Sequence, residues 1–275
     1  MTDPSAELYL DLLKKTLSYS LWPEPPKPIQ RYSVLRPRLR QTLLSAAAKV
    51  LDQWDLHLAR NAIPTPEQRA EGRDWPLLGD TMIGMKRLNS LQACVETVLQ
   101  EGVPGDLVET GVWRGGASIF MRGILKAYGI TDRTVFVADS FEGLPEPDDR
   151  YPEDAGSYFH THDFLAVSRE EVENNFRRYD LLDDQVHFLE GWFEDTLPRA
   201  PIDRLAILRL DGDMYSSTMD ALTSLYPKLS SGGFCIIDDY EISNCSRAVK
   251  DYRSANSIDA SITEIDWTGI YWRKP

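Results

Sequence analysis

The chain has no long hydrophobic run, few cysteines and too few basic residues to balance its acidic ones. No stretch approaches the roughly 18 apolar residues of a membrane span, and the N-terminus lacks the basic region and apolar core of a secretory signal. Three cysteines in 275 residues, with no C-x-x-C pair, exclude a disulfide scaffold and favour a reducing cytoplasm. A net charge of -13 would repel phosphate backbones, so no nucleic-acid partner is expected.

Motifs of several enzyme classes are also absent. The sequence contains no Gly-x-Ser-x-Gly, no Walker A motif and no sign of a Cys/His dyad. His160 and His162 have a metal-ligand spacing but no third such ligand nearby in the sequence. They are interpreted as solvated loop residues, either of which could contact substrate.

The N-terminal part differs from the rest in charge. Residues 27–61 carry seven Lys or Arg against two acidic residues, after a proline-rich connector at 22–28. Apolar residues recur at helical spacing over 39–58, which predicts a helix packed on the main domain or on a partner subunit. Binding to a membrane surface or an acidic substrate is the alternative. We expect a helical extension over 1–80, a catalytic domain over 81–275, and a homo-oligomer, either dimer or tetramer.

From residue 106 onward, apolar strands alternate with helices, which predicts an α/β fold with a doubly wound, mostly parallel sheet. Expected strands are 107–111, 135–139, 186–191, 205–211 and 233–239, and expected helices are 116–128, 169–179, 217–228 and 245–254. A terminal hairpin, 261–267 with 270–272, would bring the sheet to seven strands. The 142–168 loop is too long for a simple connection and is a candidate lid over the substrate.

The ends of the first two strands predict a nucleoside site, because ligands of open α/β sheets bind at the carboxyl ends of strands. The first strand ends in a glycine-rich turn with Gly111. Trp113 stands where a dinucleotide fold needs glycine, which favours a nucleoside without a pyrophosphate over a dinucleotide. Asp139, at the end of the second strand, could accept hydrogen bonds from ribose hydroxyls. A tight helix–strand turn and an aspartate cap are the structural alternatives.

Four carboxylates follow the fourth and fifth strands: Asp211, Asp213, Asp238 and Asp239. Clustered carboxylates repel one another unless they share protons or bind a cation. Oxygen ligands suit a hard divalent ion, so the sequence predicts a Mg²⁺ site at adjacent strand ends.

Several segments together resemble the macrocin O-methyltransferase family of class I S-adenosylmethionine-dependent methyltransferases. They are DTMIGMKRLNSLQ, DLVETGVWRGGASIFMRGIL, VFVADSFEGLP, HFLEGWFEDTLP, LRLDGDMYSSTMDAL and GGFCIIDDY. The resemblance implies a Rossmann-like fold and Mg²⁺-dependent methylation of a sugar hydroxyl on a glycoside, from a natural product, polysaccharide or glycolipid. It implies metal ligands at Asp211, Asp238 and Asp239. The cofactor contacts that it implies are Thr81, Met82, Glu109, Gly111, Arg114, Ser118, Asp139, Ser140, Gly191, Trp192, Phe193 and Asp211.

A catalytic base is expected among the same carboxylates. Related catechol methyltransferases place a lysine base three residues after the first metal aspartate, and here that residue is Met214. We therefore expect Asp211 to act as ligand and base, with Asp213 as the second choice. Two other functions stay open at this point: a nicotinamide-dependent oxidoreductase on a similar sheet, and a non-catalytic nucleoside-binding or assembly protein.

Overall fold

The computed structural model describes residues 3–28, 47–48, 50–51, 53–54, 56–61 and 63–275. Most of the helix expected over 39–58 lies outside these residues. The ends of that region do lie together, because β1 (Lys27–Pro28) pairs antiparallel with β2 (Ala59–Arg60). Among the residues described, no helix has the length and apolar character needed to span a membrane.

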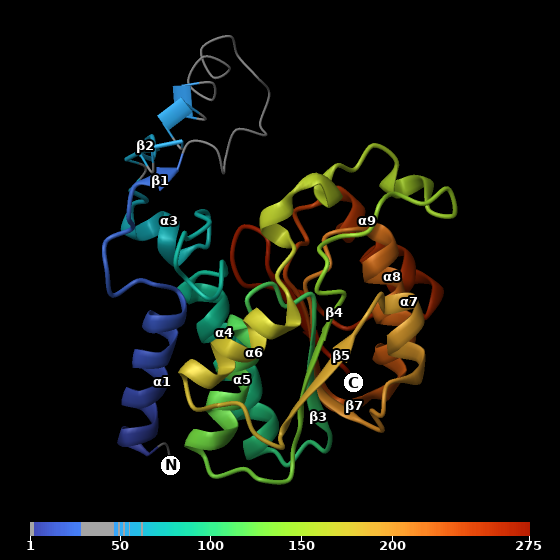
Figure 1. Ribbon diagram of the computed structural model, residues 1–275. Coiled ribbons are helices and arrows are strands. Elements are labelled where there is room, and N and C mark those ends of the chain that lie inside the picture. The colour runs from blue at the N-terminus through green and yellow to red at the C-terminus, as the bar shows by residue number, and fades with distance from the viewer. Residues whose placement is uncertain (1–2, 29–46, 49, 52, 55, 62) are drawn as a thin grey trace.

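A seven-stranded sheet forms the centre of the molecule (Figure 1), with the order β5-β4-β3-β6-β7-β9-β8. Five strands are parallel, and the C-terminal pair is antiparallel. The strands are β3 (Asp106–Thr110), β4 (Val135–Asp139), β5 (Val186–Glu190), β6 (Leu205–Leu210), β7 (Leu229–Ile237), β8 (Thr263–Glu264) and β9 (Ile270–Arg273). The doubly wound, mostly parallel seven-stranded sheet predicted from the sequence is confirmed.

Helices cover both faces of this sheet, as its apolar strands require. On one face lie α1 (Pro4–Leu17), α4 (Met85–Gln100), α5 (Gly116–Ala127) and α6 (Arg169–Arg178), and on the other α7 (Phe193–Thr196), α8 (Tyr215–Leu225) and α9 (Ser243–Ala255). A short helix, α3 (Pro66–Ala70), precedes α4. Neighbouring strand residues pack in opposite directions: Leu107 belongs to the α4–α5 core and Val108 to the α8–α9 core.

The N-terminal helix packs within the first of these cores. Leu10, Leu13 and Leu17 of α1 are buried in the same cluster as Leu88 of α4 and Phe120 of α5. The division at residue 80 stays a prediction, although α1 shares a core with the sheet.

The expected helices and strands lie close to the observed ones, with two differences. Strand β7 begins at Leu229, four residues early, because Leu229 pairs with Leu205 before a register shift brings Phe234 opposite Ile207. Strand β8 is short because the Asp266 side chain accepts hydrogen bonds from the backbone that follows it and closes a turn there.

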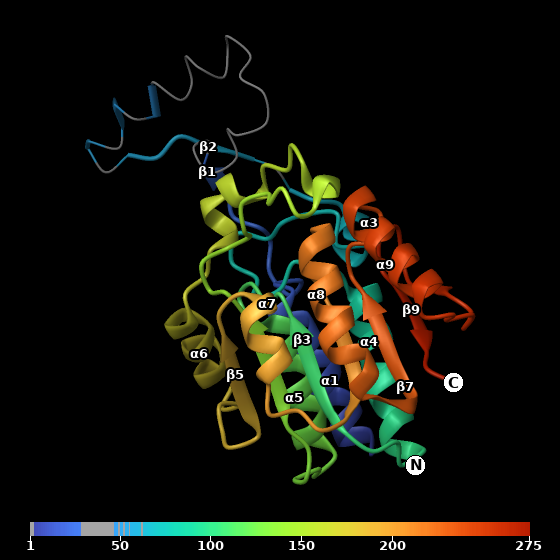
Figure 2. The ribbon, with the colours of Figure 1, turned by 90° about the vertical axis from the view of Figure 1, so that its right-hand side faces the viewer.

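The 142–168 loop runs over the carboxyl ends of the strands. It contains three short 3-10 turns, η2 (Pro152–Asp154), η3 (Phe159–Thr161) and η4 (Asp163–Leu165). Figure 2 shows this yellow-green segment at the top, above the carboxyl ends of the strands. The loop therefore covers the edge of the sheet where ligands of such folds bind.

Candidate active site

A cavity of about 670 Å³ opens at the carboxyl ends of the strands, beneath the 142–168 loop. Most of the residues predicted as functional line it: Thr81, Met82, Glu109, Gly111, Asp139, Ser140, Trp192, Phe193, Asp211, Asp213, Asp238 and Asp239. Arg114, Ser118 and Gly191 are not among its lining residues. One cavity therefore brings together residues that lie up to 158 positions apart in the chain.

The turn after β3 is built around Gly111. Its φ is 82°, and a Cβ there would lie 1.8 Å from the carbonyl oxygen of Asp211. No side chain fits, so the ends of β3 and β6 meet closely at this point. Glycine at this position is thus required by strand packing, whatever ligand approaches the turn.

Asp139 is held by the backbone of two turns. One carboxylate oxygen accepts from the amide of Val112 at 2.7 Å, and the other accepts from the amide of Phe141 at 2.8 Å. Burial raises the pKa of Asp139, while these backbone donors act in the opposite direction. The carboxylate therefore has a fixed orientation at the cavity, and both the ribose contact and the cap predicted from the sequence are compatible with it.

Trp113 links the glycine-rich turn to the 142–168 loop. Sequence reasoning missed this link. Its backbone is left-handed, with φ 48°, and its indole nitrogen donates to the carbonyl of Phe164 at 2.9 Å. The Arg114 guanidinium lies over the Trp113 ring and donates to the carbonyls of Leu77 and Gly79. Arg114 thereby holds the segment before Thr81 against the turn.

Three carboxylates converge on the cavity where β6 and β7 end. Oxygen atoms of Asp211, Asp238 and Asp239 all lie within 4.8 Å of one another. Asp213 follows in a left-handed conformation, with φ 57°, and its amide donates to Asp239 at 3.3 Å. The predicted adjacency of these strand ends is correct, since β6 and β7 pair in parallel.

These carboxylates are not fully balanced by protein cations. Burial, with repulsion from Asp211 and Asp238, raises the pKa of Asp213 to about 8. Burial and the neighbouring carboxylates also raise the pKa values of Asp211 and Asp239. A hard divalent cation would remove this repulsion, so the donor set fits Mg²⁺.

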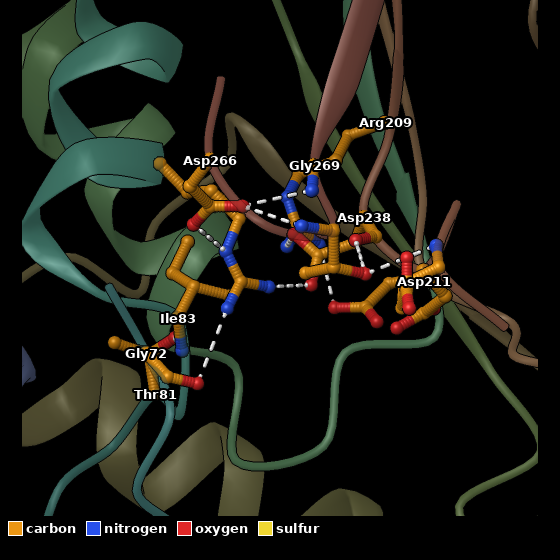
Figure 3. Close-up of polar contacts among 12 residues, drawn as sticks. Gly72, Thr81, Ile83, Arg209, Asp211, Asp238, Asp266 and Gly269 are labelled. Carbon is orange, nitrogen blue, oxygen red and sulfur yellow. Dashed lines mark hydrogen bonds and ion pairs between the residues drawn. The ribbon is translucent and has the colours of Figure 1, made fainter. Parts of the chain in front are cut away.

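Two buried arginines, which sequence reasoning missed, balance part of this negative charge and that of Glu109. Arg209 donates to Glu109 at 2.5 Å, to Asp211 at 2.8 Å and to Asp238 at 2.5 Å. Figure 3 shows Arg209 beside Asp238 and Asp211. Arg87, from α4, contacts the other oxygen of Asp238. The signal for Arg209 was a charged residue inside the apolar run LAILRL; Arg87 gave no comparable signal.

Glu109 is the least exposed acid of this network. Burial raises the pKa of Glu109 to about 7, although Arg209 and the hydroxyl of Ser118, which donates to it, act in the opposite direction. Ser118 therefore contacts Glu109 without lining the cavity itself.

A Rossmann-like sheet in this strand order, with a glycine-rich turn and an aspartate at the end of β4, defines a class I methyltransferase. The profile of the macrocin O-methyltransferase (TylF) family matches residues 6–274. The chain belongs to this family, and it is an S-adenosylmethionine-dependent O-methyltransferase.

Characterised relatives are similar over nearly the whole chain. The chain is 51% identical to 8-demethyl-8-(2,3-dimethoxy-alpha-L-rhamnosyl)-tetracenomycin-C 4'-O-methyltransferase of Streptomyces olivaceus, covering 99% of this chain and 95% of the relative. It is also 51% identical to mycinamicin III 3''-O-methyltransferase of Micromonospora griseorubida, with 98% and 96% covered. The solved structure of the O-methyltransferase NovP superposes with a TM-score of 0.84 at 47% identity, with 98% and 99% covered.

Membership of this family decides between the functions left open by the sequence. The chain is a methyltransferase, so the nicotinamide-dependent oxidoreductase and the non-catalytic binding protein are both wrong.

Proposed function

We propose that this protein methylates a sugar hydroxyl of a natural-product glycoside in a Mg²⁺-dependent reaction. The acceptor class is supported by the names of relatives that act on a rhamnosyl tetracenomycin and on mycinamicin III. The convergence of Asp211, Asp238 and Asp239 within 4.8 Å is the observation that carries the metal dependence. A cytoplasmic location and a homo-oligomeric state stay predictions from the sequence.

The cofactor would occupy the part of the cavity between β3 and β4. Asp139 would accept from the ribose hydroxyls, because its carboxylate is already oriented by two backbone amides. Trp192 and Phe193 line the wall of the cavity beyond β5, and the resemblance implies that both contact the cofactor. Thr81 and Met82 line it from the segment before α4.

The acceptor hydroxyl would lie beside the carboxylates. Bound there, Mg²⁺ would supply Lewis-acid chemistry that lowers the pKa of a sugar hydroxyl. Asp211 would bind the metal and take the proton, with Asp213 as the second choice. Met214, where related enzymes carry lysine, is 1% exposed and cannot act as a base. Most of the rate acceleration would come from holding two reactants in line.

The test combines turnover with direct metal binding. Purified protein is incubated with S-adenosylmethionine and either mycinamicin III or demethyldecarbamoylnovobiocin, the acceptors in the names of two relatives. The methylated product is detected by mass spectrometry. We expect product that disappears with EDTA and returns with Mg²⁺, and calorimetry should show Mg²⁺ binding that Asp239→Asn weakens. Full activity after exhaustive chelation would contradict the metal dependence, and faster methylation of a free catechol than of either glycoside would contradict the acceptor class.

A further inference from the structure

His162 is a buried residue of the 142–168 loop, so its interpretation from the sequence as a solvated residue is wrong. Its side chain belongs to a residue that is only 8% exposed, and its Nδ1 atom is enclosed with no partner among the residues described. Buried polar atoms in proteins are nearly always paired, so an imidazole whose Nδ1 is left unpaired costs free energy in the folded state. No contact within the loop offsets that cost.

Aromatic side chains surround the imidazole. The ring centroid of His162 lies 5.5 Å from Tyr158, 6.5 Å from Phe159 and 5.5 Å from Phe164. A phenylalanine would pack in this shell without leaving a nitrogen unpaired. Packing alone therefore does not explain an imidazole at this position.

The imidazole of His162 belongs to the lining of the cavity. His162 lines the same cavity as the carboxylates, and since Nδ1 is enclosed, the accessible nitrogen is Nε2. A neutral imidazole offers one donor and one acceptor, depending on its tautomer. A hydroxyl group both donates and accepts, so it matches Nε2 in either tautomer.

The loop that carries His162 is attached to the body of the protein on both sides of it. Towards the C-terminus, the Phe164 carbonyl accepts from Trp113, and the Phe164 ring lies 4.9 Å from Trp75. Towards the N-terminus, Asp154 accepts from the amide of Tyr215, the first residue of α8, at 2.8 Å. The backbone that carries His162 is thus attached to the body of the protein on both sides.

We propose that His162 is an acceptor-binding residue, with Nε2 hydrogen-bonded to a hydroxyl of the acceptor sugar. This role rests on the proposed function. Phe159, which packs near His162 and lines the same cavity, would contact an apolar face of the same sugar. The contact selects the acceptor and takes no part in binding S-adenosylmethionine.

Three substitutions separate the accessible nitrogen from the enclosed one. His162→Phe removes both nitrogens but keeps the packing. His162→Gln places an amide near the position of Nε2, whereas His162→Asn ends near Nδ1. The matched control is His187→Phe: His187 is an exposed residue of β5 that packs on Phe136 and does not line the cavity.

Steady-state kinetics use mycinamicin III and demethyldecarbamoylnovobiocin as acceptors. With the acceptor that the wild type methylates, we expect His162→Phe and His162→Asn to raise the acceptor KM about tenfold, as for one lost hydrogen bond. His162→Gln should stay within about threefold of the wild type. The KM for S-adenosylmethionine should not change in any of the three variants. The unfolding temperature of His162→Phe should not be lower than that of the wild type. His187→Phe should have the kinetic constants of the wild type.

The outcomes distinguish this role from the proposed function. An unchanged acceptor KM in His162→Phe, or an equal rise in the KM for S-adenosylmethionine, would overturn the role of His162 alone. A wild-type protein that methylates neither glycoside would overturn the proposed function, and the role of His162 with it.

Discussion

The floor and the roof of the cavity are built differently. In the floor, Arg209 joins Glu109 and Asp238, and the three are 1%, 2% and 4% exposed. The roof is the 142–168 loop, whose only helical elements are 3-10 turns of three residues, and its Tyr158 is 54% exposed. The groups that we assign to the reaction are thus fixed by the sheet, whereas the acceptor contact that we propose comes from a loop attached at a few points. Changes in the roof would alter the choice of acceptor without disturbing the reacting groups.

The largest effect is expected from a change in the floor at Asp211. Asp211→Asn keeps a hydrogen-bond acceptor for Arg209 but removes the charge and the proton acceptor. Turnover should fall about 10³-fold, within the range for loss of a general base, while calorimetry shows that the variant still binds S-adenosylmethionine. The matched control is Asp132→Asn, at an exposed position before β4, at the opposite end of the sheet. Turnover of Asp211→Asn within tenfold of the wild type would remove Asp211 from the reaction.

The second-largest effect is expected from removing Arg209, the buried arginine of the floor, which should lower the stability of the protein. Arg209→Met leaves Glu109 and Asp238 without their shared cation, which should lower the free energy of unfolding by about 3–5 kcal/mol. The control is Arg177→Met in α6, because Arg177 is 52% exposed and pairs with Glu173 one helical turn away. Such a pair contributes about 0.3–0.5 kcal/mol. The free energy of unfolding of both variants is measured by urea denaturation. Similar losses would show that the Arg209 network stabilises the fold no more than the exposed Arg177–Glu173 pair does.

The sequence predicts the positions of the floor carboxylates better than it predicts the residues that contact them. An apolar run that ends in Asp139 or Asp238 locates a strand end directly, since strand length and burial are local properties. The contact between Arg87 and Asp238 joins residues 151 positions apart. Nothing local specifies it, because it depends on how α4 packs against the sheet. The same holds for Trp113, whose turn is local but whose partner in the 142–168 loop is not.

A smaller effect is expected for the cofactor at the edge of the floor. Asp139→Asn keeps one acceptor for the turn but loses the charged acceptor for the ribose, which should weaken binding by about 1.5–3 kcal/mol, or about 10- to 150-fold in Kd. Asp106→Asn is a matched control: Asp106 accepts from the Thr134 amide at 2.8 Å at the opposite end of β3. Calorimetry with S-adenosylmethionine should separate the two variants. Equal affinities in both would place the ribose elsewhere.

The smallest effect should come from the hydrogen bond between Trp113 and Phe164, which connects the floor to the roof. Trp113→Phe keeps an aromatic ring but removes the donor to the Phe164 carbonyl, so the 142–168 loop loses one attachment worth about 1 kcal/mol. Trp272→Phe is the matched control, because the buried indole of Trp272 donates to the Tyr226 hydroxyl at 3.2 Å, and Trp272 does not line the cavity. Both variants should lose similar stability. Only Trp113→Phe should raise the acceptor KM, by about three- to tenfold, with S-adenosylmethionine affinity unchanged. If the acceptor KM of Trp113→Phe matched that of Trp272→Phe, the attachment of the loop to the turn would matter for folding and not for holding the acceptor.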